Sequence, residues 1–285
     1  MPSPYTKQYA TPAALVAHLL NRGLTIPNPA FAENKIDEIG YNRLRIYLLS
    51  RRQKNAPGKP FLPGITFEDI IALYELDDEL RMRCFRYVGQ FEILFRNALS
   101  ESLSRRHGAH PYSDSSIYQD ARAATRAVKC MTDAFLSKID KDQRAKHYSD
   151  NYNDPLLPPI WSMKEFMTFG AVNSFYGNLS NVEKTEISKL FGIINFELFG
   201  KWVNALIDLR NICAHHDRLF NHRFQKQPER YRAAGVPSAA QNTLKGLLEC
   251  LEYLLRARGF AVPVVADIDA VIRSCPSVRP GEAGS

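Results

Sequence analysis

The sequence lacks the features that would carry it into or across a membrane. No window of about 18 residues is continuously apolar, which excludes a membrane-spanning helix. The first residues, MPSPYTKQYATPAALVAHLLNRG, do not have the charged-then-apolar layout of a secretory signal. We therefore expect a cytoplasmic protein that makes no membrane contact.

Cysteine is scarce, and its spacing carries no disulfide or metal pattern. The five cysteines, Cys84, Cys130, Cys213, Cys250 and Cys275, are widely separated and form no C-x-x-C pair. Glycine-rich phosphate loops are absent, as is any motif for a serine or cysteine nucleophile. These absences remove many classes of cofactor chemistry, and we expect no cofactor and no metal.

What the sequence does contain is a moderately basic, well-mixed composition. Lys and Arg number 37 against 30 Asp and Glu, which gives a formal net charge of +7. With 45% hydrophobic and 24% charged residues, the chain can bury a core and does not resemble a disordered protein. The positive excess attracts polyanions, of which nucleic acid is the commonest candidate.

Apolar residues recur with the helical period along most of the chain, whereas the alternation typical of strands barely occurs. Thr66 is a predicted cap for a long helix over residues 67–106. The other expected helices include residues 119–148 (as one helix or two), 161–176, 195–218, 238–258 and 264–274. We predict an all-α bundle that forms a single domain over residues 1–285, with a frayed tail at 276–285.

The segment LRNICAHHDRLFN, residues 209–221, concentrates polar groups on one expected helix. Asn211 and His215 are four residues apart and share a helix face, and the long Arg210 side chain can bend toward the imidazole. An imidazole transfers protons near neutral pH, and a guanidinium binds phosphate oxygens. Two such sets, from protomers related by a two-fold axis, could cleave RNA at its own 2′-hydroxyl without a metal.

Other interpretations of this segment stay open on the residues alone. The cluster can be a buried network of structural hydrogen bonds. Zinc binding by Cys213, His215, His216 and His222 is disfavoured, because adjacent histidines on a helix point about 100° apart. Arg218 and Asn221 extend the cluster. They can bind phosphate or cap the last helical carbonyls.

Four blocks of the sequence stand out, in this order: FLPGITFEDIIALYELDDELR (61–81), YVGQFEILFRNALS (87–100), PPIWSMKEFMTFGAVNSFYGNLS (158–180) and LRNICAHHDRLFN (209–221), which carries the R-N-x-x-x-H pattern. Together they resemble the Abi (abortive infection) proteins of the AbiD/AbiF type, in the HEPN superfamily. The similarity extends over roughly residues 30–222.

The resemblance implies an all-α, HEPN-like bundle with additional helices that dimerises and cleaves RNA without a metal. Arg210 and His215 match the catalytic pair of the superfamily, and Asn211 matches its polar second position. His216 matches a further histidine common in the Abi proteins. Glu92 and Arg96 match a pair on an upstream helix, where Glu92 would orient the catalytic residues and Arg96 would contact phosphate.

We therefore predict a homodimeric endoribonuclease that acts in phage defence or as a toxin. The alternative is a non-catalytic member of the same fold that binds RNA or a protein, and a third interpretation is a helical scaffold with no role in nucleic-acid binding. The expected partner is RNA, as substrate or as a bound small RNA. Any antitoxin or regulatory RNA stays unidentified at this stage.

Overall fold

The computed structural model describes residues 4, 6, 8–279 and 282. Every regular element in this part of the chain is a helix. Strand-like pairing there is limited to isolated bridges, such as the one between Thr25 and Thr66. The predicted all-α class is thus confirmed.

The chain groups into two compact units. The first comprises residues 1–80 and 270–282, and the second comprises residues 81–269 and 283–285. The longest helix, α4 (Phe67–His107), contributes to both. The expectation of a single domain over residues 1–285 stays a prediction.

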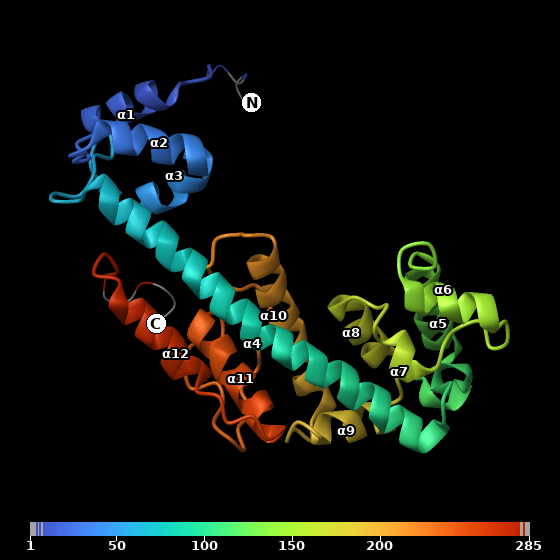
Figure 1. Cartoon of the computed structure of the whole chain (residues 1–285). Helices are drawn as coiled ribbons and strands as arrows, with labels where there is room; N and C mark the ends of the chain where they lie inside the picture. Colours follow the sequence, from blue (N-terminus) through green and yellow to red (C-terminus); the bar gives the residue numbers. More distant parts are fainter. Residues whose placement is uncertain (1–3, 5, 7, 280–281, 283–285) are drawn as a thin grey trace. The chain divides into compact units, whose positions relative to one another are not determined.

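In the first unit, α1 (Pro12–Asn21), α2 (Pro29–Ile39) and α3 (Tyr41–Ser50) lie beside the first turns of α4 (Figure 1). The hydroxyl of Tyr47 on α3 donates a hydrogen bond to Asp77 on α4 at 2.5 Å. Both side chains are buried, and this bond satisfies a carboxylate that would otherwise be costly to bury.

The chain's last described residues belong to this first unit. The buried guanidinium of Arg51 donates to the Ser277 carbonyl at 2.7 Å and to the Glu282 carboxylate at 2.6 and 2.8 Å. The segment 276–285 was expected to be frayed, and Ser277 and Glu282 are instead held by this buried arginine. Residues 280–281 and 283–285 of that segment lie outside the described residues.

Helix α4 begins where the sequence predicts. The Thr66 hydroxyl accepts a hydrogen bond from the Asp69 N–H at 3.1 Å, and the Asp69 carboxylate accepts one from the Thr66 N–H at 2.9 Å. This reciprocal pair satisfies two backbone donors that the first turn of a helix leaves without partners. The helix then continues for 41 residues.

The core of the second unit is aromatic and centres on the middle of α4. The rings of Phe91 and Phe95 lie 6.2 and 6.3 Å from the ring of Phe169, and Phe95 lies 5.8 Å from Phe199. All four side chains are buried. These contacts join α4 to α8 and α10. They thereby determine which face of α4 packs in the core and which face remains outside it.

The remaining helices follow in chain order. They are η1 (Pro111–Ser113), η2 (Ser115–Ile117), α5 (Ala121–Leu136), α6 (Gln143–Asn151), α7 (Ile160–Met163), α8 (Phe169–Asn178), α9 (Asn181–Lys189), α10 (Phe196–Ala214), α11 (Leu244–Ala257) and α12 (Val264–Ser274). No helix in the described part of the chain has the length and apolarity needed to cross a membrane.

Three predicted helix boundaries are wrong. The first is the start of the helix expected over 238–258, which begins only at Leu244. The other two concern α7–α8 and α10. The helix expected over 161–176 is divided into α7 and α8 by a turn at residues 164–168, and the Thr168 side chain caps α8 by accepting from the Ala171 N–H at 3.2 Å. Helix α10 ends at Ala214 and does not continue to about residue 218. These last two differences shape the candidate site.

Candidate functional site

One carboxylate, Glu92 on α4, lies between two arginines that come from different helices (α4 and α10, Figure 1). Arg96, one turn further along α4, donates to the Glu92 Oε1 through Nε at 3.2 Å and through a second, shorter bond from Nη2. Arg210 on α10 approaches from the other side, with its Nε 3.5 Å from Glu92 Oε2. The structure thus brings together Glu92, Arg96 and Arg210, which the sequence singled out.

Arg96 is held on all sides. Its side chain is only 13% exposed, and its Nη1 donates to the carbonyls of Lys164 and Met167, both at 2.6 Å. Those carbonyls belong to the turn between α7 and α8. Every nitrogen of this guanidinium therefore has a protein partner, and Arg96 fastens the turn to α4.

Arg210 is held less completely. Its guanidinium carbon lies 5.8 Å from the centre of the Phe85 ring, a cation–π contact, and its Nη1 donates weakly to the Asn211 side chain at 3.4 Å. Its Nη2 makes no hydrogen bond with the described residues, its Nε is buried without one, and the side chain is 33% exposed. Glu92 and Phe85 thus fix the position of the guanidinium and leave donors for a ligand.

The end of α10 explains where the two histidines lie. The Asp217 N–H donates to the Ile212 carbonyl at 2.9 Å, and the His216 N–H donates to the Cys213 carbonyl at 3.2 Å. This is the Schellman arrangement, which needs a left-handed residue, and His216 supplies it with φ +55°. The sequence analysis placed both histidines on the helix, but His215 caps it and His216 follows it.

The imidazole of His215 is exposed and makes no hydrogen bond or ion pair with the described residues. His216 is exposed as well. A structural network therefore describes Glu92 and Arg96 well, but it does not account for His215. An exposed imidazole at a helix end, five residues after Arg210, is accessible to a ligand.

Arg218 and Asn221 lie in the loop that follows α10, where Asn221 has a left-handed φ of +54°. Leu219 and Phe220, which lie between Arg218 and Asn221 in the sequence, have buried side chains that anchor this loop. The last carbonyls of α10 are capped by backbone N–H groups, which disfavours the capping role that the sequence allowed for these two residues. Arg218 is half-buried, so part of its side chain is open to solvent.

Sequence analysis missed one member of the cluster, Phe85. It lies on α4 seven residues before Glu92, a spacing that puts both on one helix face and could have indicated it. In the described part of the chain, no three His, Cys, Asp or Glu side chains are placed so that they could hold a metal ion.

The fold and this cluster define the class of the protein. It is an all-helical protein in which a largely buried Glu–Arg pair on one long helix positions a second arginine, five residues before the exposed histidine that ends another helix.

The Abi-like protein family model matches residues 34–221, more than half of the chain, and the chain therefore belongs to the Abi-like family. Membership supports a general role in abortive infection, a form of phage defence. No curated protein and no solved structure matches the chain.

Proposed function

We propose that this Abi-like protein is a metal-independent endoribonuclease of the HEPN superfamily and the AbiD/AbiF type, active as a homodimer. It would act in the cytoplasm, in phage defence or as a toxin. The observation that carries the proposal is that Arg210, fixed by Glu92 with donors to spare, lies five residues before the exposed imidazole of His215 at the end of the same helix.

The chemistry needs no group from outside the protein and the RNA. The 2′-oxygen of the strand attacks the neighbouring phosphorus, and the bond from phosphorus to the 5′-oxygen breaks, which leaves a 2′,3′-cyclic phosphate. One His215 imidazole takes the proton of the 2′-hydroxyl, and a protonated imidazole gives one to the departing 5′-oxygen. Arg210 donates to the phosphate oxygens as their negative charge rises.

A single chain supplies one His215, so an acid and a base require two copies. An exposed apolar set on α4 supports such an assembly. Met82, Phe85 and Ile93 are 61%, 43% and 61% exposed and fall within an arc of about 80° around the helix. Phe85 also contacts Arg210, so a second copy on this face would lie next to the cluster.

The decisive test is His215→Ala. We expect RNA cleavage to fall about 10²- to 10⁴-fold, because proton transfer by a positioned side chain contributes that much. The melting temperature should not change, since the imidazole makes no contact that the fold requires. Cleavage by the wild-type protein should persist in EDTA, and mass spectrometry should find 2′,3′-cyclic phosphate ends.

Salt-sensitive RNA binding with no turnover by the wild-type protein would instead identify the non-catalytic RNA-binding alternative. Absence of both binding and turnover would leave only a protein-interaction or scaffold role.

The dimer is tested separately by Ile93→Lys, with Ile194→Lys as the control because Ile194 is 68% exposed away from the cluster. A charge on the α4 face should convert a dimer into a monomer in light scattering and lower cleavage in parallel. The control should do neither. A wild-type monomer, or an Ile93→Lys variant that stays dimeric, would contradict this assignment of the interface.

A further inference from the structure

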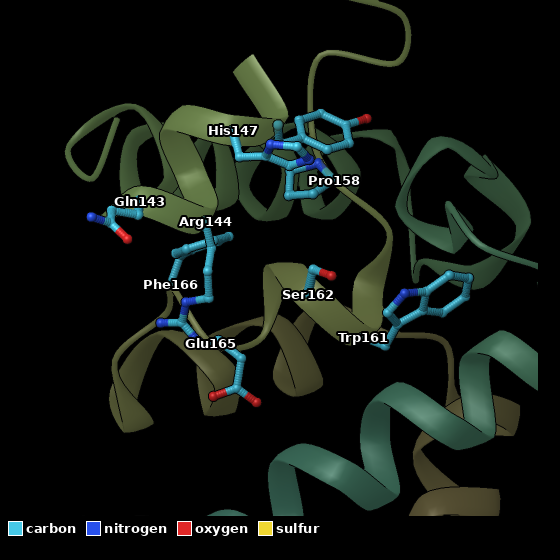
Figure 2. Close-up of a pocket in the computed structure, with 9 residues that line it drawn as sticks. Gln143, Arg144, His147, Pro158, Trp161, Ser162, Glu165 and Phe166 are labelled. Carbon is cyan, nitrogen blue, oxygen red and sulfur yellow. The ribbon is translucent and has the colours of Figure 1, made fainter. Parts of the chain in front are cut away.

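The second unit contains a pocket of about 420 Å³ that the proposed cleavage chemistry does not use (Figure 2). One wall comes from α6, through Arg144 and His147. The other comes from α7 and the turn after it, through Trp161, Ser162 and Glu165. A volume of this size is in the range of pockets that hold small organic ligands.

The lining combines aromatic faces with a few polar groups. Trp161 is 50% exposed, whereas Phe166 is buried. The guanidinium of Arg144 lies over the Phe166 ring at 5.6 Å and forms an ion pair with Asp142 at 2.8 Å. A half-exposed indole offers a face on which a flat ligand can stack.

The charges of the lining favour an uncharged ligand group. Arg144 and Glu165 carry opposite charges. Arg144 already has Asp142 as a partner, and the hydrogen bonds that Arg144 donates lower the pKa of the Asp142 carboxyl to about 2. A phosphate would meet the Glu165 carboxylate. A nucleobase instead offers both acceptors for Arg144 and donors for Glu165 on its edge, and a π-face for Trp161.

This pocket is joined to the candidate cleavage site by short contacts. Trp161, Ser162 and Glu165 belong to the stretch whose Lys164 carbonyl accepts a hydrogen bond from Arg96. Arg96 in turn binds Glu92, which pairs with Arg210. The wall of the pocket and the arginine of the cleavage site therefore depend on the same anchored side chain.

We propose that this pocket binds a single nucleobase, stacked on Trp161 with its edge turned toward the opposite side of the pocket, which carries Arg144 and Glu165 (Figure 2). That the base belongs to a single-stranded RNA substrate rests on the proposed ribonuclease function. A free nucleotide has the same base chemistry, and the experiment below separates the two sources.

Tryptophan fluorescence reads the pocket directly. The chain has two tryptophans, and the other, Trp202, is fully buried. A stacked base should therefore quench Trp161 alone. The probes are a short single-stranded RNA and the four 5′-mononucleotides, added to full-length His215→Ala protein so that the RNA stays intact, with inorganic polyphosphate as the probe that has charge but no base.

We expect saturable quenching by RNA, and its loss in Trp161→Phe, where only Trp202 still emits. Trp161→Ala should weaken RNA binding, measured by filter retention, about 5- to 150-fold, the range for loss of one stacked base. Arg144→Gln should weaken it about 2- to 12-fold. Lys146→Gln is the matched control, because Lys146 lies on the same helix but does not line the pocket, and it should bind as before.

RNA quenching that mononucleotides do not displace would assign the base to a strand, whereas tighter binding of a mononucleotide would assign it to a free nucleotide. Absent quenching, quenching by polyphosphate alone, or variants that bind like the parent protein would overturn the pocket proposal. If the wild-type protein cleaves RNA and Trp161→Ala does so with unchanged kcat and KM, the nuclease stands and the pocket fails. If RNA quenches Trp161 saturably but the wild-type protein cleaves no RNA, the pocket proposal stands and the nuclease proposal fails.

Discussion

The two arginines that share Glu92 differ sharply in their surroundings. Arg96 is 13% exposed and uses all three of its nitrogens on Glu92 and two carbonyls. Arg210 is 33% exposed and has one weak hydrogen bond, to Asn211. The same difference in burial separates the middle of α4, which packs in the core, from the exposed end of α10, where His215 lies.

This difference indicates a division of labour between the two regions. A largely buried guanidinium in which every nitrogen has a protein partner stabilises the fold but has little left to offer a ligand. A guanidinium fixed by an ion pair and an aromatic ring keeps its position and its remaining donors together. The sequence analysis gave Arg96 a phosphate contact, and the geometry favours a positioning role for it instead.

The largest expected effect is on stability, from Arg96→Ala. Removing a largely buried arginine that holds Glu92 and two carbonyls should lower the free energy of unfolding by about 3–5 kcal/mol. Chemical denaturation measures this. Arg105→Ala is the control, because Arg105 and Glu101 form the same i,i+4 ion pair on α4 with side chains 76% and 61% exposed. The Arg105→Ala variant should lose less than about 0.5 kcal/mol. Equal losses in the two variants would contradict the structural role assigned to Arg96.

Arg210→Ala should have the opposite profile. We expect cleavage to fall about 10²- to 10³-fold, the cost of losing one donor to a developing negative charge. Unfolding free energy should fall by about 1 kcal/mol or less, since the side chain is partly exposed and Glu92 keeps Arg96. Initial cleavage rates and denaturation on the same preparation test both halves. A variant as unstable as Arg96→Ala would mean that Arg210 is structural too.

The smallest effect concerns the backbone at the end of α10. His216 has a φ of +55°, which glycine adopts more readily, so His216→Gly should raise the unfolding free energy by about 0.5–1 kcal/mol. Ala214→Gly, two residues earlier and still helical, should lower it by a similar amount. Should His216→Gly destabilise the protein, the contacts of the imidazole would outweigh the relief of backbone strain.

Much of the fold could be predicted because its signals are local. Thr66 caps its helix with its own side chain, as the sequence predicted. The break between α7 and α8 could not be predicted in this way. It depends on carbonyls that bind Arg96, which lies about 70 residues earlier in the chain.

The end of α10 was missed for a different reason. The sequence HHDR contains no glycine at the position where a helix usually turns into the left-handed region. Histidine adopts that conformation uncommonly, so the pattern predicted a longer helix than the one that forms. The misplaced boundary put both histidines on a helix face, when His215 caps the helix and His216 turns the chain away.

By itself, the sequence determined that the chain is helical, where most helices begin, and which polar residues belong to the candidate site. Periodicity and capping act over a few residues, so they can be recognised in the sequence without a structure. Only the tertiary structure decided that Glu92 pairs with both arginines, that Arg96 is enclosed, and that Arg210 keeps donors to spare. Those outcomes depend on how α4 packs against α10 and the α7–α8 turn, because burial and distance arise only when segments far apart in sequence meet.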